Sequence, residues 1–292
     1  MTHSVAVLGA GTMGHGIAQV TARAGLPTRL YDLDGGVAAK GKESVASSLA
    51  RLVEKGKLTP AERDATLASI VTTADLGEAV ARATLVVEAV PEKMDLKVEL
   101  FRAVVSLEPT VRVLASNTSS LSITELGRRS GAEERVIGHH FFNPPPVMEL
   151  LEIVRGAATS PATLEESLSF ASRIGKTPIV VRDFPGFATS RLGVCIGAEA
   201  VRMLEQGVGK VADLDRAMEL GYRHPMGPLK LSDLVGLDVR LAILEHLHRE
   251  LGEVFRPPAL LRQMVRAGRL GKKTGLGFYR WTERGPEPAE LP

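Results

Sequence analysis

Residues 138–154, GHHFFNPPPVMELLEIV, contain two histidines and two glutamates at spacings that suit acid–base chemistry. A histidine held by a carboxylate is a common acid–base device, because imidazole can take or give a proton near neutral pH. In an extended strand neighbouring side chains point to opposite faces, so His139 and His140 cannot both face one site. Glu149 and Glu152 also differ in parity if ELLEIV is a strand. The residues alone therefore leave four pairings open.

A glycine motif near the N-terminus, GAGTMG, matches the GxGxxG pattern after a predicted strand and at the start of a predicted helix. Gly9 allows the tight turn, Gly11 lets the backbone approach a pyrophosphate, and Gly14 lets helix and strand pack closely. Thr12 and Met13 lie where the free N–H groups of the helix would meet phosphates. The motif predicts a dinucleotide site; the alternative is a glycine turn that binds no nucleotide.

Charged residues follow the next strands of this predicted sheet. Asp32 ends the second strand, where it can accept hydrogen bonds from the ribose hydroxyls of NAD and would repel the 2′-phosphate of NADP. Arg29 has the opposite strand parity and argues only weakly for NADP. Glu92 and Lys97, with Glu88, follow a later buried strand and are further cofactor candidates. Their alternative role is at a helix start, where acidic residues favour the helix dipole.

Short apolar runs alternate with longer helical patterns, which predicts βαβ units and an α/β, doubly wound sheet of the Rossmann type. The predicted strands are residues 4–9, 28–34, 84–90, 111–116, 135–142 and 177–183. Residues 14–25 predict a helix. The segment Thr59-Pro60-Ala61-Glu62 predicts a capping box that opens the second helix of a helical hairpin inserted at roughly residues 36–69.

The pattern changes after DFPGF, residues 183–187, and is helical to about residue 267. We therefore predict two domains, 1–184 and 185–292, the second all-α. Its predicted helices are SRLGVCIGAEAVRMLEQG and residues 213–220, 230–235 and 239–251. The polar, proline-rich tail TERGPEPAELP is expected to fray.

Composition excludes several classes of protein. The formal net charge of +2 gives no basic field for nucleic acid or an anionic membrane. Cys195 is the single cysteine, which excludes an internal disulfide and fits a reducing compartment. The N-terminus lacks the pattern of a signal peptide. No stretch reaches 18 consecutive apolar residues, so we predict no membrane span. We expect a soluble cytoplasmic protein with no metal.

Several motifs together resemble one family, the short-chain L-3-hydroxyacyl-CoA dehydrogenases, and most closely the bacterial 3-hydroxybutyryl-CoA dehydrogenases. The resemblance covers the chain to about residue 281 and rests on these motifs in order: VAVLGAGTMGHGIAQV, VVEAVPEKMDLK, ASNTSSLSIT, VIGHHFFNPPPVMELLEIVRG, DFPGF, HPMGPLKLSDLVGLD and GKKTGLGFY. It implies an N-terminal NAD domain, a helical C-terminal domain that mediates homodimerisation, and an acyl-CoA cleft between them.

The resemblance also selects the acid–base pair. The family places its catalytic histidine directly before Phe-Phe-Asn-Pro, which is His140, and the partner glutamate in the segment that corresponds to Glu152. His139 falls where the family needs no histidine, so we interpret it as structural. Neutral His140 would take the alcohol proton as hydride leaves the same carbon, and Glu152 would fix its tautomer and stabilise the imidazolium.

Other roles are likewise implied by the resemblance. Ser119 would hydrogen-bond the reacting oxygen or the nicotinamide region, and Asn117 would line the cofactor. Asn143, restricted by the prolines that follow it, would hold an oxyanion or the substrate carbonyl. Arg51 and Lys55 would meet CoA, although a solvated helix face explains them equally well.

One residue departs from the family pattern. Where the family reads PGF-x-x-N-R, this chain has Ser190 in place of the asparagine that helps to bind substrate. This replacement bears on fine substrate specificity more than on the class of reaction. Two alternatives remain: a dehydrogenase of a non-CoA hydroxy acid such as L-gulonate, and a non-enzymatic nucleotide-binding protein of the crystallin type.

Overall fold

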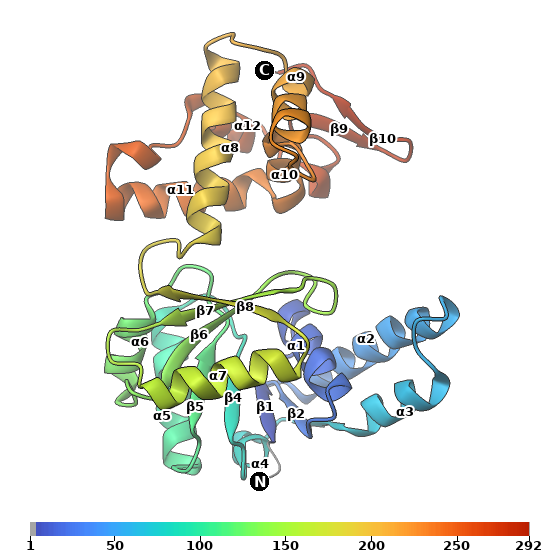
Figure 1. Cartoon of the computed structure of the whole chain (residues 1–292), viewed down its shortest axis with the longest axis vertical. Coiled ribbons are helices and arrows are strands. Elements are labelled where there is room, and N and C mark those ends of the chain that lie inside the picture. Colours follow the sequence, from blue (N-terminus) through green and yellow to red (C-terminus); the bar gives the residue numbers. More distant parts are fainter. Residues whose placement is uncertain (1–3, 292) are drawn as a thin grey trace. The chain divides into compact units, whose positions relative to one another are not determined.

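The computed structural model describes residues 4–291, and the chain divides into two compact units between Phe184 and Pro185. The first unit is built on one sheet whose strand order is β3-β2-β1-β4-β5-β6-β7-β8 (Figure 1). Its strands are β1 (Val5–Leu8), β2 (Thr28–Tyr31), β3 (Ile70–Thr73), β4 (Leu85–Glu88), β5 (Val113–Ser116), β6 (Val136–Phe141), β7 (Leu150–Arg155) and β8 (Thr177–Arg182). The order reverses beside β1, as in a doubly wound sheet, and this confirms the predicted fold class.

Neighbouring strands are parallel except for β6 and β7, which are antiparallel. The sequence patterns predicted six of these strands but missed β3 and left β7 conditional. Antiparallel pairing needs only a short connection, here the proline-rich loop of residues 142–149. That loop brings the end of β6 and the start of β7 to the same edge of the sheet.

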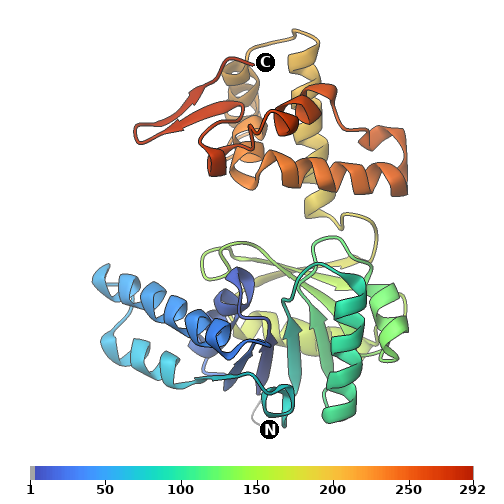
Figure 2. The ribbon, with the colours of Figure 1, turned by 180° about the vertical axis from the view of Figure 1, so that it is seen from behind.

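Helices cover both faces of this sheet. They are α1 (Thr12–Arg23), α2 (Gly35–Glu54), α3 (Pro60–Ala68), α4 (Leu76–Val80), α5 (Met94–Leu107), α6 (Ile123–Ser130) and α7 (Pro161–Arg173). Figure 1 shows α7 lying across one face, and α5 lies in front of the other face in Figure 2. Ile17 of α1 and Phe170 of α7 belong to one apolar cluster with Val5 and Val7 of β1. Burial of this shared apolar surface holds the helices against the sheet and so fixes where the strands end.

The predicted helical hairpin is present as α2 and α3, which extend beyond the β3 edge of the sheet in Figures 1 and 2. The predicted capping box is confirmed. Thr59 Oγ1 accepts a hydrogen bond from the Glu62 N–H at 3.2 Å, and Glu62 Oε2 accepts one from the Thr59 N–H at 2.8 Å. Two otherwise unsatisfied donors at the start of α3 are paired in this way.

The second unit is mainly helical. Its elements are α8 (Thr189–Glu205), α9 (Val211–Arg216), a π-helical turn (Ala217–Gly221), α10 (Pro228–Val235), α11 (Leu237–Leu251), α12 (Ala259–Arg266), β9 (Tyr279–Thr282) and β10 (Gly285–Pro288). Leu229, Leu247, Met264 and Phe278 are at the centre of its separate apolar core. No helix within residues 4–291 is long and apolar enough to cross a membrane.

The expectation of a frayed tail is wrong, because β9 and β10 form an antiparallel hairpin. Two buried carboxylates anchor its first strand. Asp233 accepts hydrogen bonds from the Tyr279 N–H at 2.8 Å and from Trp281 Nε1 at 3.1 Å, and Asp215 accepts one from the Tyr279 hydroxyl at 2.7 Å. Pro286 and Pro288 fall on β10, an edge strand of this two-stranded sheet, where a missing N–H donor is tolerated.

Candidate active site

A histidine and a glutamate meet at the carboxyl end of β6. The antiparallel register places His140 opposite Glu152, and His140 Nδ1 lies 2.8 Å from Glu152 Oε2. Glu152 is fully buried and the His140 side chain is only 9% exposed. Glu149 is exposed and precedes β7. Of the four pairings that the sequence leaves open, the structure therefore forms His140 with Glu152.

The geometry of this pair suits acid–base chemistry. When Nδ1 carries a proton, it donates to the Glu152 carboxylate, so the tautomer is fixed and Nε2 becomes the nitrogen that exchanges a proton. A carboxylate at 2.8 Å also stabilises the imidazolium that proton uptake creates.

His139 lies on the opposite face of β6. Its ring stacks on Phe170 of α7 with a centroid distance of 5.6 Å and an interplanar angle of 8°. Neither ring nitrogen has a hydrogen-bond partner among residues 4–291, and burial lowers the pKa of His139 to about 3. The ring is therefore neutral at physiological pH and is part of the packing beneath α7.

The ends of β4, β5 and β6 are tied together by side chains that the sequence had singled out. Asn117 Oδ1 accepts a hydrogen bond from the Phe141 N–H at 2.9 Å, one residue after His140. Glu92 Oε1 accepts one from the Ser119 N–H at 3.0 Å. The structure thus brings Asn117, Ser119 and Glu92 to the same edge of the sheet as His140.

Lys97 is part of a buried ion pair. Its Nζ lies 2.6 Å from Glu88 Oε1 and 3.3 Å from Glu92 Oε2, and both Lys97 and Glu88 are almost completely buried. Burial raises the pKa of Glu88, while Lys97 and a hydrogen bond from Ser116 oppose that rise. These contacts brace the ends of β4 and β5. A direct contact of Glu92 or Lys97 with the cofactor stays a prediction.

The glycine turn fits a dinucleotide. Gly9 has φ +99°, and a Cβ there would lie 2.7 Å from the carbonyl oxygen of Ala89. A Cβ at Gly14 would lie 1.7 Å from the carbonyl oxygen of Gly9, so both positions require glycine. At Gly11 nothing lies within 4 Å, which leaves bare backbone for a pyrophosphate. Helix α1 begins at Thr12 without a side-chain cap, so its N–H groups can bind an anion.

A cavity of about 630 Å³ adjoins this turn and is lined by Gly11, Thr12, Met13 and Asp32, among others. Asp32 Oδ2 accepts a hydrogen bond from the Ala10 N–H at 2.9 Å, which ties the carboxylate to the glycine turn. Arg29 donates to the carbonyl oxygen of Ala81 at 2.6 Å and does not line this cavity. The acidic end of β2 therefore suits the ribose of NAD.

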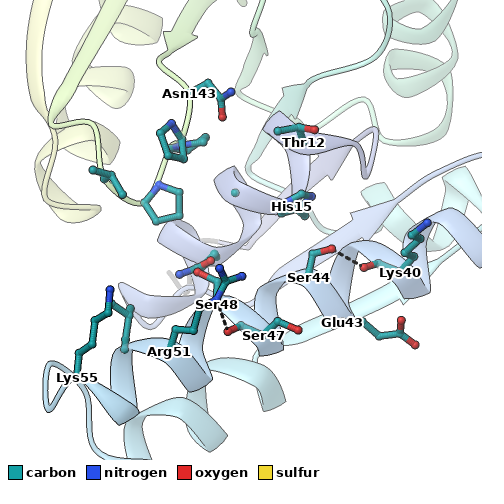
Figure 3. Close-up of a pocket in the computed structure, with 17 residues that line it drawn as sticks. Thr12, His15, Lys40, Glu43, Ser44, Ser47, Ser48, Arg51, Lys55 and Asn143 are labelled. Atoms are coloured by element: carbon teal, nitrogen blue, oxygen red, sulfur yellow. Dashed lines mark hydrogen bonds between the residues drawn. The ribbon is translucent and has the colours of Figure 1, made fainter. Parts of the chain in front are cut away.

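A second cavity, of about 760 Å³, lies between α2 and the loop after β6 (Figure 3). Arg51 of α2 and Lys55, the residue directly after α2, line one wall, and Asn143 lies on the loop opposite them. Sequence reasoning did not find His15, Lys40, Ser44, Ser47 and Ser48, which also line it. The signal was available for His15, which directly follows the glycine motif. The others lie about one to three turns before Arg51 on α2.

The loop of residues 143–147 is held by a buried lysine. Lys176, the residue directly before β8, donates hydrogen bonds to the carbonyl oxygens of Pro145 and Met148, both at 2.6 Å. On its other side the Pro145 ring packs so closely on Gly16 of α1 that a Cβ there would lie 2.8 Å from it. The loop, and Asn143 with it, is therefore a fixed wall of the cavity.

Ser190 lies in the first turn of α8, in the second unit, and is partly buried.

The doubly wound sheet and the cavity at its glycine turn define a class of protein, a dehydrogenase that binds a dinucleotide at the carboxyl ends of parallel strands. Comparison with known proteins agrees. The family model described as "3-hydroxyacyl-CoA dehydrogenase, NAD binding domain" matches residues 4–184, and that described as "3-hydroxyacyl-CoA dehydrogenase, C-terminal domain" matches residues 186–281. The chain belongs to the 3-hydroxyacyl-CoA dehydrogenase family, and its cofactor is NAD.

Curated relatives and solved structures resemble nearly the whole chain. A probable 3-hydroxybutyryl-CoA dehydrogenase of Bacillus subtilis is 45% identical over 281 residues, which cover 96% of this chain and 98% of the relative. A 3-hydroxybutyryl-CoA dehydrogenase of Mycobacterium tuberculosis is 43% identical, with 94% and 97% covered. The crystal structure of (S)-3-hydroxybutyryl-CoA dehydrogenase from Ralstonia eutropha matches with a TM-score of 0.93 at 41% identity and covers 97% of this chain and 100% of that one.

Proposed function

We propose that this enzyme interconverts short (S)-3-hydroxyacyl-CoA and 3-ketoacyl-CoA thioesters, with 3-hydroxybutyryl-CoA as the representative substrate. The observation that carries the proposal is the 2.8 Å contact between His140 Nδ1 and Glu152 Oε2 at the carboxyl end of β6. The relatives at 43–45% identity, both named as 3-hydroxybutyryl-CoA dehydrogenases, support the substrate class.

In this proposal His140 is the general base. Neutral His140 removes the proton of the substrate hydroxyl while the hydride leaves the same carbon, and Glu152 stabilises the imidazolium that results. NAD, when bound, accepts the hydride. In the reverse direction, charged His140 protonates the oxygen of the 3-keto group.

The remaining site residues hold cofactor and substrate. We assign the cofactor to Gly9, Gly11, Thr12, Met13, Gly14, Asp32, Glu92, Lys97, Asn117 and Ser119. Ser119 and Asn143 hydrogen-bond the reacting oxygen or the substrate carbonyl. Arg51 and Lys55 bind the phosphates of CoA in the second cavity, because two cations beside a cavity of about 760 Å³ suit a large anionic carrier. Ser190 contacts the acyl group where most of the family has an asparagine.

We also propose a division of labour between the units. Residues 1–184 bind NAD, and residues 185–292 mediate homodimerisation and contact substrate. Large apolar side chains exposed on α8 and α10 support a two-fold interface: Leu192, Ile196, Leu231, Leu234 and Val235. Sedimentation that gives only the 31.2 kDa monomer at micromolar concentration would refute the dimer. The single cysteine supports a cytoplasmic location, and the substrate class supports a role in fatty acid metabolism.

The decisive experiment follows the absorbance of NADH with acetoacetyl-CoA as substrate and with free acetoacetate as its matched control. Turnover of the thioester alone is the expected result. Turnover of free hydroxy or keto acids alone would instead favour an L-gulonate-like dehydrogenase, and no turnover with either would favour the crystallin-type alternative.

The same assay tests the choice of coenzyme. We expect a higher kcat/KM with NADH than with NADPH, because the Asp32 carboxylate repels a 2′-phosphate. Asp32→Ala should bring the kcat/KM values with NADH and NADPH closer together. A wild-type preference for NADPH would remove the assignment of Asp32.

A further inference from the structure

A third cavity, of about 410 Å³, lies at the ends of β7 and β8 in the first unit. Its lining residues, none of which lines the cavity at the glycine turn or the second cavity, are Thr124, Arg155, Gly156, Ala157, Arg182 and Asp183. We call it the arginine cavity. The proposed function uses neither of its two arginines.

The two arginines are neighbours in the sheet. Arg155 is the last residue of β7 and Arg182 is the last residue of β8. These strands are parallel, and their register pairs the two residues directly. Neighbouring strands lie about 4.8 Å apart, so both side chains leave the same side of the sheet next to each other. Like charges at paired positions are destabilising unless an anion lies between them.

No carboxylate supplies that anion. Among residues 4–291, neither Arg155 nor Arg182 forms an ion pair or a hydrogen bond through its side chain. The carboxylate in the cavity, Asp183, is committed to the start of α6, because its Oδ2 accepts hydrogen bonds from the Ser122 hydroxyl at 2.7 Å and the Thr124 N–H at 2.8 Å. Both guanidinium charges therefore lack a counter-ion in the described part of the chain.

The donors of the cavity suit an oxyanion. Arg155 is half-buried and its Nε is sealed from solvent, which restricts the guanidinium, while its two terminal nitrogens are not among the sealed atoms. Thr124 Oγ1 accepts a hydrogen bond from the Ala157 N–H at 3.0 Å. The hydroxyl hydrogen of Thr124 has no acceptor among residues 4–291, so it can be donated to a ligand.

We propose that the arginine cavity binds a doubly charged phosphate group, either free phosphate or the phosphomonoester of a small metabolite. Two guanidinium groups match a charge of about −2, and each can donate parallel N–H bonds to phosphate oxygens. The Thr124 hydroxyl is a further donor. A single carboxylate would compensate only one of the two arginines. The inference goes beyond the proposed function and does not rest on it, because the cavity shares no lining residue with the two cavities assigned to NAD and CoA.

The Arg155 Nε–H group is a probe of this cavity alone, whereas a calorimetric signal would include phosphate bound elsewhere. In ¹⁵N-labelled wild-type protein its signal is identified as the one that Arg155→Lys lacks. That signal should shift as inorganic phosphate replaces chloride at constant ionic strength, and the titration gives Kd. Arg182→Met, at an exposed position, should raise Kd at least ~10-fold, as expected for the loss of a charged hydrogen-bond donor. Arg128→Met, exposed on α6 and outside the cavity, is the matched control and should keep the wild-type Kd.

Glycerol 3-phosphate distinguishes the two sources of the phosphate group. Tighter binding than inorganic phosphate would assign the cavity to a phosphorylated metabolite, and weaker binding would assign it to free phosphate. An Arg155 signal that phosphate leaves unmoved would overturn the proposal, and so would a wild-type Kd in folded Arg182→Met or equal affinity for acetate. Turnover of acetoacetyl-CoA tests the proposed function separately, because its absence would leave the phosphate titration unaffected.

Discussion

The two faces of β6 place adjacent histidines in opposite environments. On one face, His140 lies against the β7 carboxylate of Glu152, with Nδ1 and Oε2 at 2.8 Å. On the other, His139 is completely buried against Phe170, and neither of its ring nitrogens has a partner in the described part of the chain. The two residues share type, strand and depth of burial, yet only His140 has a partner that stabilises its charged form.

This difference shows that partners, rather than burial, make a histidine chemically useful. Burial alone removes charge, as the pKa of about 3 for His139 illustrates. A buried carboxylate opposite the ring offsets that penalty and gives the proton a defined position. The register of β6 with β7 assigns the carboxylate to His140, because His139 is opposite Ile153.

The largest expected effect comes from replacing His140, the histidine that has a carboxylate partner. His140→Gln should lower kcat for acetoacetyl-CoA by at least ~10²-fold, the usual scale for a lost general acid–base group. Glu152→Gln should also be severe, because it removes the charge that stabilises the imidazolium. His139→Gln is the matched control on the opposite face and should cost far less. A folded His139→Gln enzyme with the larger defect would reverse the assignment.

The second effect concerns stability on the other face. The unfolded-state pKa of His139 is near 6.5 and its folded-state pKa is about 3, so the unfolded chain binds a proton that the folded chain excludes. Stability is therefore lost as pH falls from 6.5 toward 3, with a slope approaching ~1.4 kcal/mol per pH unit. His139→Leu removes this penalty and leaves no unpaired ring nitrogen.

Urea unfolding at pH 7.5 and pH 5 measures the difference. Lowering the pH should cost the wild type about 2 kcal/mol more of unfolding free energy than it costs His139→Leu. Phe170→Leu is a control that disturbs the same contact without removing the titrating group, so its pH dependence should match the wild type. Equal pH dependence in wild type and His139→Leu would mean that His139 is hydrated in solution.

Much of the architecture could be predicted from the sequence, because strong local patterns encode it. The glycine turn with Asp32, the capping box at Thr59 and the alternating strands and helices all depend on short-range spacing. The pairing of His140 with Glu152 depends on the register of β7, which parity alone could not supply; only the family resemblance selected it. The hairpin of β9 and β10 was missed for a related reason, since its anchor, Asp233, is 46 residues away from Tyr279.

Lys176 connects the packed side of the sheet, beneath α7, with the loop that forms a wall of the second cavity. Lys176 lies three residues after the end of α7, the helix whose Phe170 covers His139, and it is nearly completely buried. Its ammonium holds the loop that carries Asn143 through the carbonyl oxygens of Pro145 and Met148. Burial lowers the pKa of Lys176, and the two carbonyl groups supply the dipoles that compensate its charge.

The smallest predicted effect is therefore a change in substrate binding rather than in chemistry. Lys176→Met keeps the apolar stem but removes both hydrogen bonds, each worth about 0.5–1.5 kcal/mol, and frees the loop. We expect KM for acetoacetyl-CoA to rise about threefold to tenfold, since tenfold corresponds to ~1.4 kcal/mol, while kcat changes less than about threefold. Lys57→Met, at an exposed position after α2, is the control for loss of one positive charge and should leave both constants near wild type. Steady-state kinetics of the three proteins decide the matter. A fall in kcat with unchanged KM would instead show that Lys176 supports the acid–base pair of His140 and Glu152 rather than the wall of the cavity.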